Sequence, residues 1–396
     1  MSKEEIKSII ENPKKLNEAG VEVLHSFCPY RVCPLGAHVD HQLGLVTGFA
    51  LDIGTSFDFF ATDDGEIEVY SENFDGDAFG NVNDEFERQY TWVDYLFGAI
   101  KTLKKSYNIT KGLKGILKGD ILGGGLSSSA SVILTYIKAF SKINGINLAS
   151  PELINLAIDE ERNYIGVNVG KLDQSCEVYC KKNHLLYLDT KTDSTKLIPI
   201  PKNMADFEIA VIFSGVERKL AGSEYNTRVD ECKAASYALK DFAHLDYGKF
   251  ADSYLSDVPL GIYKQYKNKL PHTWEKRAAH FYGENERVKE GIKAFQNGNL
   301  VEFGKIIFES GRSSIEKYET GSNELKVLHE ILEKTEGVYG GRFSGAGFNG
   351  CAMAIINPEF KDSIKAAVQN EYLSKFPDLS NKFSIVFCKT ADGVGL

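Results

Sequence analysis

The run Ile-Leu-Gly-Gly-Gly-Leu-Ser-Ser-Ser-Ala at residues 121–130 contains the residue types that most directly indicate chemistry. Its glycines let the backbone turn sharply and approach a ligand closely. The apolar run at 132–140 predicts a buried helix directly behind them. Free N–H groups and the helix dipole make such a helix start an anion site. We interpret the run as a cradle for nucleotide phosphates, and the alternative is a glycine turn with a serine cap.

This run differs from two familiar phosphate-binding loops. No Gly-Lys-Ser/Thr follows it, so it is not a Walker loop, and it lacks the third glycine of the dinucleotide fingerprint. Two other loops are dense in polar chemistry: residues 28–44, rich in Pro, Gly, His and charge, and residues 166–174, Gly-Val-Asn-Val-Gly-Lys-Leu-Asp-Gln. Loops of this composition between apolar segments are candidate sites.

Composition limits the class of protein. The chain has 396 residues, enough for two domains, of which 43% are hydrophobic. A formal net charge of −9 argues against a nucleic-acid or membrane-surface partner. The seven cysteines are odd in number and scattered, which suggests reduced thiols. The N-terminus has no apolar signal core, and no stretch approaches the roughly 20 apolar residues of a membrane span. We therefore expect a cytoplasmic protein.

Hydrophobic periodicity predicts a strand-rich first half and a helix-rich second half. Strands are expected at 21–27, 49–53, 55–61, 66–71, 115–120 and 207–213, and helices at 92–103, 132–140 and 150–165. Beyond residue 215, helices are expected at 225–243, 276–296, 298–318, 323–335 and 358–373, and strands at 352–356 and 383–387. We predict a leader at 1–20, an N-terminal domain at 21–214 and a C-terminal domain at 215–396. The glycine-rich loops are expected to meet at the domain junction, where ligand sites are common.

Three loops in this order resemble those of the GHMP small-molecule kinases, and within them the galactokinase branch. They are the early charged loop, the Gly-Leu-Ser-Ser-Ser-Ala loop and the late Ser-Gly-Ala-Gly-Phe-Asn-Gly-Cys loop at 344–351. The resemblance covers nearly the whole chain. It implies a sugar 1-kinase that depends on ATP and Mg²⁺. It also implies an α+β, two-domain fold, with an N-terminal domain like domain 2 of ribosomal protein S5 and a ferredoxin-like C-terminal domain.

The resemblance also implies roles for individual residues. Asp173 matches the base that meets the anomeric hydroxyl, and Arg31 the arginine beside it. Glu161 and Ser129 match the magnesium ligands. Asp40 and Tyr225 match residues that bind the sugar. The other residues that we expect to bind it are Ala37, His38, His41, Gly170, Lys171 and Arg218. The residues implied to bind the nucleotide are Trp92, Gly123, Gly124, Gly125, Leu126, Ser127 and Ser128.

The early loop departs from galactokinases where they receive the sugar 6-hydroxyl. Galactokinases usually have glutamate where this chain has Ala37, and tyrosine where it has His41. Two like charges about 4 Å apart cost on the order of 4 kcal/mol at an effective dielectric near ~20, so a sugar carboxylate would be repelled by that glutamate. Alanine removes the repulsion. The loop Tyr-Arg-Val-Cys-Pro-Leu-Gly-Ala-His-Val-Asp-His-Gln also resembles galacturonokinases, so D-galacturonate is favoured over D-galactose.

The sequence leaves several alternatives open. The candidate donors for a sugar carboxylate are Lys171, Arg218, Lys219, His38 and His41, and each Lys or Arg also fits a solvated surface charge. The other functions that fit the sequence are an ordinary galactokinase with an altered pocket, a non-catalytic sugar- and ATP-binding sensor, and a GHMP kinase for a different substrate, such as another sugar acid or a heptose phosphate. We expect a small-molecule sugar as the partner, no nucleic acid, no membrane, and a monomer or weak homodimer.

Overall fold

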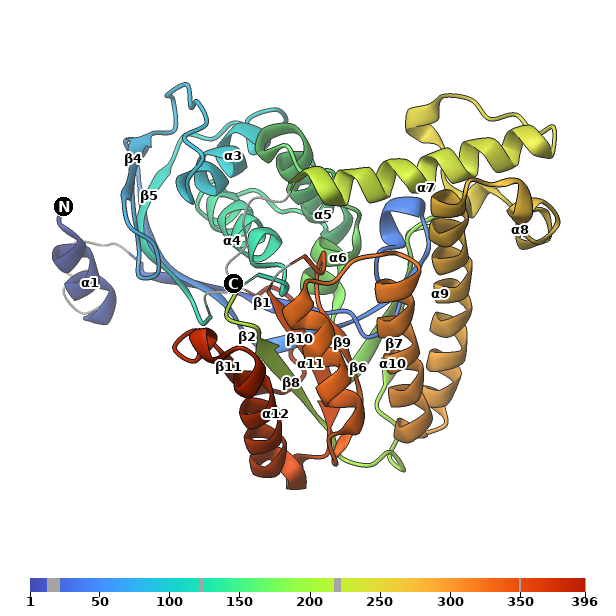
Figure 1. The fold of residues 1–396 in the computed structure, drawn as a ribbon. Coiled ribbons are helices and arrows are strands. Elements are labelled where there is room, and N and C mark those ends of the chain that lie inside the picture. The colour runs from blue at the N-terminus through green and yellow to red at the C-terminus, as the bar shows by residue number, and fades with distance from the viewer. Residues whose placement is uncertain (13–21, 122–123, 217–221, 349, 396) are drawn as a thin grey trace.

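The structure is a computed structural model that describes the chain except residues 13–21, 122–123, 217–221, 349 and 396, and except the side chains of 222–224. Two β-sheets carry the fold, and helices cover them (Figure 1). This mixture confirms the predicted α+β class. In the part of the chain that is described, no helix is both long and apolar enough to cross a bilayer.

The first sheet has seven strands in the order β4-β3-β5-β2-β6-β7, with β1 paired to β2. Its strands are β1 (Leu24–Val32), β2 (Leu45–Thr62), β3 (Glu66–Ser71), β4 (Asp77–Asn81), β5 (Gly112–Gly119), β6 (His184–Asp189) and β7 (Ser194–Pro199). We predicted two strands at 49–53 and 55–61, but β2 runs through both because its start pairs with β6 and its end with β5. Gly54 does not break the strand: a Cβ there would lie 2.1 Å from the Cys28 carbonyl oxygen of β1.

The second sheet has four antiparallel strands in the order β11-β8-β10-β9. They are β8 (Glu208–Phe213), β9 (Val338–Phe343), β10 (Cys351–Ile356) and β11 (Ser384–Cys388). The sheets therefore divide the chain before β8, whereas the predicted domain boundary at 214/215 follows it. Alternate β8 residues enter two apolar clusters, Val211 on one face and Ile212 on the other. Because both faces of the sheet are covered, the sequence of β8 is one continuous apolar run after Glu208.

The helices fall into two groups (Figure 1). Those of the first half are α1 (Lys3–Glu11), α3 (Val93–Leu103), α4 (Ser128–Ile143), α5 (Ser150–Asp159) and α6 (Leu172–Tyr179). Those of the second half are α7 (Gly222–Phe242), α8 (Leu260–Tyr266), α9 (His272–Gln296), α10 (Leu300–Glu316), α11 (Asn323–Lys334) and α12 (Lys361–Lys375). Short helical turns are η1 (Asp40–Gln42), η2 (Glu160–Ile165), η3 (Phe250–Asp252), η4 (Leu255–Asp257), η5 (Lys267–Lys269), η6 (Pro358–Phe360) and η7 (Pro377–Leu379).

The core consists of layers that fix the loops between them. Helices α3 and α4 pack on the first sheet, while α11 and α12 cover one face of the second. A third cluster joins the two sheets, with Phe49 and Leu185 on one side and Val211 and Met353 on the other. The chain end also returns to the first sheet, where Gly395 pairs with Phe27. Loops from both halves of the chain are thereby held against each other.

Candidate active site

Arg31 and Asp173 lie side by side although 142 residues separate them in the sequence. Arg31 is in β1, and Asp173 is in the first turn of α6, where we had predicted a loop over 166–174. The Arg31 Nε and Nη2 atoms lie 2.9 and 2.8 Å from Asp173 Oδ1. Burial lowers the pKa of Arg31, but the neighbouring carboxylates Asp173 and Glu177 raise it more, so the net shift is upward. The guanidinium is therefore a permanent cation at the side of Asp173.

The described part of the Gly-Leu-Ser-Ser-Ser-Ala loop meets the late glycine loop at 344–351, as predicted. Arg31 Nη1 and Ser344 Oγ both donate to the Gly125 carbonyl, at 2.9 and 2.7 Å. Gly125 has a φ of +106°, and a Cβ there would lie 2.9 Å from the Ser344 carbonyl oxygen. Only glycine fits such a position without strain. Gly123 lies outside the described residues, so its predicted role stays a prediction.

The start of α4 leaves backbone donors available. Ser127 occupies the N-cap position with a left-handed φ of 67°, and its side chain makes no capping hydrogen bond. The alternative of an ordinary serine cap is therefore not what the structure shows. The first N–H groups of a helix have no partner inside it, so an anionic ligand is suited to this position. Ser128 is exposed, whereas the side chain of Leu126 belongs to the core.

Residues of three segments gather beside Asp173. Asp40, in η1, accepts a hydrogen bond from the Leu172 N–H at 3.3 Å. A Cβ on Gly170 would lie 1.9 Å from Asp40 Oδ2, so this close approach requires glycine. Burial, and then the charge of Asp173, raise the pKa of Asp40 to about 6. Burial, and then Asp40 and Asp173, also raise the pKa of Tyr225 on α7.

His38 combines a strained backbone with a free ring nitrogen. Its φ is +60°, a left-handed conformation that is uncommon outside glycine and concentrates at functional sites. Its Nε2 is buried and has no hydrogen-bond partner among the residues that the structure describes. Burial, and then the cation Arg342, lower the pKa of His38, which favours the neutral ring. Ala37, beside it, is buried, and its carbonyl lies 2.9 Å from His280 Nε2.

The other predicted sugar-binding side chains have partners within the protein. His41 Nε2 lies 3.0 Å from the Tyr318 hydroxyl, and His41 Nδ1 lies 3.2 Å from Gln42 Nε2. Lys171 Nζ is ion-paired to Asp193 Oδ1 at 2.6 Å, with the Asp193 side chain 63% exposed. Arg218 and Lys219 lie outside the described residues.

Known proteins match this chain over most of its length. Residues 94–181 match the model of the GHMP kinases N terminal domain, and residues 292–375 match that of the GHMP kinases C terminal domain. A galacturonokinase from Arabidopsis thaliana is 34% identical over 94% of this chain and 93% of its own length. The chain belongs to the GHMP kinase family. A galactokinase from Clostridium perfringens is 32% identical over 87% of this kinase and 89% of its own length.

Solved structures agree with this assignment. The crystal structure of Lactococcus lactis galactokinase complexed with galactose superposes on the kinase with a TM-score of 0.88 and 29% identity, covering 98% of this chain and 99% of that one. A mevalonate kinase of 17% identity shares the fold, with a TM-score of 0.63. These matches confirm the two-domain GHMP fold and the galactokinase branch. The protein is therefore a sugar kinase, with a hydroxyl group as acceptor and ATP as donor.

Of the two predicted magnesium ligands, Glu161 lies beside α6 and Ser129 lies at the start of α4. Glu161 lies in η2, is buried, and accepts a hydrogen bond from the Gln174 side chain, next to Asp173 in the chain. Ser129 is half-buried in the first turn of α4. Within the described ranges, no group of three or more His, Cys, Asp or Glu side chains is arranged to hold a metal ion. The metal roles of Glu161 and Ser129 remain predictions.

A third acidic residue, Glu177, lies one helical turn after Asp173 and was not predicted. It is fully buried, and neither carboxylate oxygen has a hydrogen-bond partner in the described part of the kinase. Burial, and then the charge of Asp173, raise its pKa well above the ordinary value. The i, i+4 spacing from Asp173 was the available signal. It was missed because this segment was predicted to be a loop and not a helix.

Trp92 immediately precedes α3 and is largely buried. Its indole Nε1 donates to the Asp75 carbonyl at 3.1 Å, and its ring belongs to the core between α3 and the first sheet. The structure gives Trp92 a clear packing role. Its predicted contact with the nucleotide remains a prediction.

Proposed function

We propose that the kinase transfers the γ-phosphate of ATP to the anomeric hydroxyl of D-galacturonate, giving galacturonate 1-phosphate and ADP. The observation that supports galacturonate as the substrate is the pair Ala37–His38 in the early loop. Ala37 brings no carboxylate to this position, and His38 brings a buried ring nitrogen that has no partner among the described residues. The similarity to a galacturonokinase over nearly the whole chain supports the same substrate.

Charge is the first reason to prefer an acidic sugar. Asp40 and Asp173 already place two carboxylates close together. Burial first, and then the charge of Asp173, raise the pKa of Asp40 to about 6. A glutamate at position 37 would add another, and a sugar carboxylate would then be opposed by like charge. With Ala37, only the two acids proposed to serve the ring hydroxyls and the reaction remain, and no glutamate at this position opposes an anionic group on the sugar.

The second reason is the donor that remains. Lys171 is tied to Asp193, and both ring nitrogens of His41 have partners. Among the described candidates, this leaves His38, whose Nε2 would donate an N–H to a carboxylate oxygen. A hydrogen bond to a charged group typically contributes ~1.5–3 kcal/mol, about twice a neutral one. We infer that His38 is the main carboxylate ligand from the early loop.

The residues around Asp173 suit proton transfer. Both contacts from Arg31 fall on Oδ1, and the described structure shows no hydrogen bond to Oδ2. We infer that Oδ2 accepts the proton of the anomeric hydroxyl as that oxygen attacks the phosphoryl group. Arg31 also holds the Gly125 carbonyl at 2.9 Å, so it fixes the base relative to the phosphate loop. Phosphoryl transfer depends mostly on such positioning and on charge neutralisation.

We propose that Mg²⁺ accompanies ATP and is held by Glu161 and Ser129. Magnesium commonly takes one or two protein oxygen ligands and completes its shell with water and substrate phosphates. A buried carboxylate and a nearby hydroxyl at the start of α4 are oxygen donors of the kind it prefers. When bound, the ion would neutralise charge on the phosphates.

A substrate panel tests the proposal. ADP release would be measured with ATP and magnesium for galacturonate, glucuronate, galactose and N-acetylgalactosamine, with the highest kcat/KM expected for galacturonate. Ala37→Glu should lower the kcat/KM for galacturonate. Ala37→Gln is the matched control, because it adds a side chain of similar volume without the charge. A higher kcat/KM for galactose in the unaltered enzyme would overturn the proposal. Equal effects of the two substitutions would remove the charge argument.

Galactokinase activity is the second candidate, and one observation favours it. The kinase superposes on a galactokinase complexed with galactose over 98% of its length. Asp40, Gly170 and Tyr225 gather beside Asp173, as the resemblance to galactokinases implies. The same panel separates the two candidates, because a neutral sugar has no acidic group for His38 to meet.

A further inference from the structure

Tyr318 is a fully buried residue between α10 and α11 that contacts the early loop twice. Its ring stacks on His38 with the centroids 4.6 Å apart and the planes 11° apart. Its hydroxyl lies 3.0 Å from His41 Nε2. Tyr318 had no predicted role. It joins the two histidines of the loop that we place around the sugar.

The direction of the hydrogen bonds at His41 follows from its neighbour Gln42. The Leu255 N–H donates to Gln42 Oε1 at 3.0 Å, which fixes the orientation of the amide. The other end of the amide, Nε2, can only donate, and it lies 3.2 Å from His41 Nδ1. His41 Nδ1 is therefore an acceptor, and the proton of the neutral ring is on Nε2. The Tyr318 oxygen accepts a hydrogen bond from this Nε2–H, so every hydrogen bond from Leu255 through Gln42 and His41 to Tyr318 is donated in the same direction.

The environment keeps His41 neutral. Burial, and then His280 and Lys233, lower its pKa to about 3. At neutral pH its Nε2–H is therefore a fixed donor to Tyr318. The hydroxyl position of Tyr318 is specified by this bond, and the ring position by the stacking on His38.

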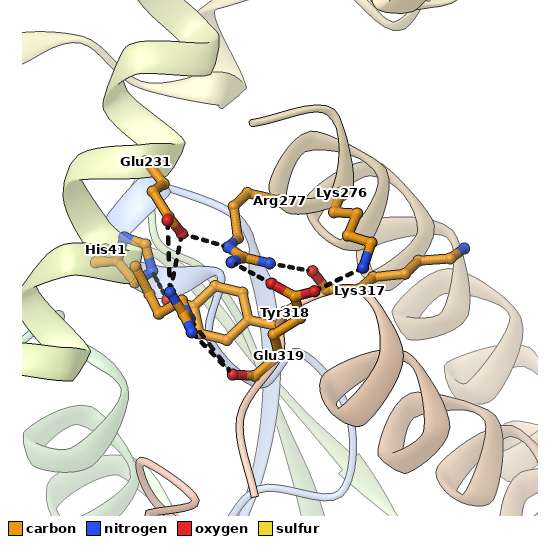
Figure 2. A network of polar contacts seen from close by, with 8 residues as sticks. His41, Glu231, Lys276, Arg277, Lys317, Tyr318 and Glu319 are labelled. Carbon is orange, nitrogen blue, oxygen red and sulfur yellow. Dashed lines mark hydrogen bonds and ion pairs between the residues drawn. The ribbon is translucent and has the colours of Figure 1, made fainter. Parts of the chain in front are cut away.

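Two arginines hold the segment around Tyr318: Arg228 donates to the Glu319 carbonyl at 3.2 Å, and the buried Arg277 contacts the residues on both sides of Tyr318 (Figure 2). Arg277 Nη1 donates to the Lys317 carbonyl at 2.6 Å, and Arg277 Nη2 to Glu319 Oε2 at 2.8 Å. The residues on both sides of Tyr318 are thus held by the same guanidinium. The Arg277 side chain is 0% exposed, and its Nε pairs with Glu231 Oε2 of α7 at 2.6 Å. The anchor therefore ties α9, α7 and the segment 317–319 together.

Glu319 is held in place from two sides. Lys276 Nζ lies 2.6 Å from Glu319 Oε1, opposite the bond from Arg277 (Figure 2). These hydrogen bonds lower the pKa of Glu319 to about 2, so it is ionised at neutral pH. Its φ of +54° is a conformation that L-residues rarely adopt. Such a backbone persists only where surrounding contacts determine it, and the ion pairs supply those contacts.

We propose that Arg277 and Tyr318 are positioning residues for the sugar pocket: Arg277 anchors Tyr318, and Tyr318 holds the His38 ring toward the acidic group of the sugar. This inference rests on the proposed placement of the sugar beside His38. In the described structure Arg277 and Tyr318 contact neither the loop at 121–130 nor Asp173, whereas Thr320, two residues after Tyr318, donates to the Ala346 carbonyl of the late glycine loop at 2.7 Å. We therefore expect Arg277 and Tyr318 to affect sugar binding more than ATP binding. The readout is therefore a change in the KM for the sugar that the KM for ATP does not share.

Steady-state kinetics on the full chain would test this with paired variants. Arg277→Met is expected to raise the KM for the sugar by about 10-fold and to leave the KM for ATP within about two-fold. Arg277→Lys should recover part of the loss, because one hydrogen-bonding cation remains. Tyr318→Phe keeps the stacking on His38 and removes the His41 acceptor, so it should raise the KM less than Tyr318→Leu.

A control separates positioning from general loss of stability. Lys114 is 12% exposed and pairs with Glu66 and Glu68 of the first sheet, at 2.6 and 2.9 Å. Lys114→Met removes a comparable ion pair from a part of the fold that has no role in the proposed site. It should lower Tm without changing the KM for the sugar.

Two results would overturn the inference. One is an unchanged sugar KM in folded Arg277→Met. The other is a parallel change of kcat and both KM values, which would indicate a role in the whole fold. Failure of the proposed function looks different, because the unaltered enzyme would then prefer a neutral sugar. The KM for that neutral sugar and the KM for ATP could still be compared in the Arg277 and Tyr318 variants. Failure of the proposed function and failure of the positioning role therefore give different results.

Discussion

Arg31 contacts Asp173 through two nitrogens and the Gly125 carbonyl through the third. One guanidinium thereby connects the proposed base with the loop proposed to hold the phosphates. Because all three contacts come from a planar group with fixed geometry, the distance between base and loop is set by the arginine. The reacting oxygen and the phosphoryl group must meet across this distance.

Asp173→Asn should abolish most turnover and leave the fold intact. The amide oxygen keeps the hydrogen bonds from Arg31, but the amide cannot accept the proton of the sugar hydroxyl. General base catalysis typically contributes 10²–10⁴-fold, so we expect kcat to fall by about that factor. Tm and the KM for ATP serve as controls and should change little. Full turnover by the variant would rule out Asp173 as the base.

His38→Leu should weaken sugar binding selectively. The ring that stacks on Tyr318 and the donor proposed for the sugar acid are both lost. Loss of a hydrogen bond to a charged group costs ~1.5–3 kcal/mol, so the KM for galacturonate should rise about 10- to 100-fold. The KM for ATP is the internal control. An equal loss with galactose and galacturonate would show that His38 does not meet the acidic group.

Lys171→Ala should have almost no effect on sugar binding, although Lys171 was a predicted ligand. Its ammonium is paired with Asp193 at an exposed position, at 2.6 Å. Exposed ion pairs of this kind typically contribute ~0–1 kcal/mol to stability. We expect a KM for galacturonate within about two-fold of the unaltered enzyme. A ten-fold rise would mean that Lys171 leaves Asp193 and meets the sugar.

His329 should make the fold sensitive to acid. Burial, and then Arg312 and Arg342, lower its pKa to about 4 in the folded state. Its unfolded pKa is ~6.5. Between these values the unfolded chain binds more protons, so this stabilisation is complete above pH ~6.5 and is lost as the pH falls toward ~4. The total is on the order of 3 kcal/mol.

Denaturant unfolding of His329→Gln at several pH values measures this effect. The free energy of unfolding of the variant should fall less steeply between pH ~6.5 and ~4 than that of the unaltered protein. The slope should not vanish, because burial also lowers the pKa of His280 to about 4. An identical pH dependence in both proteins would contradict the prediction.

The predicted elements match the structure where the pattern is local. The strand expected at 66–71 is β3, and the second-half helices fall within a few residues of α7, α9, α10 and α11. The strands that were missed lack that pattern. Most residues of β7 are exposed, so it shows no alternation. In β9 a Cβ on Gly340 would lie 2.3 Å from the Gly304 carbonyl oxygen of α10, so close packing on the helix requires glycine where a strand pattern would show a larger side chain.

The sequence by itself determined the chemistry that is available: the glycine loops, the proposed base and its arginine, and an early loop with alanine in place of glutamate. Tertiary structure alone decided how those side chains are used. Lys171 pairs with Asp193, His41 with Tyr318, and His38 is left with a free nitrogen among the described residues. The physical reason is the distance along the chain over which each signal acts. Residue type and periodicity report on neighbours a few positions away. Tyr318 lies 277 residues from His41 in the sequence, and only packing brings the two together.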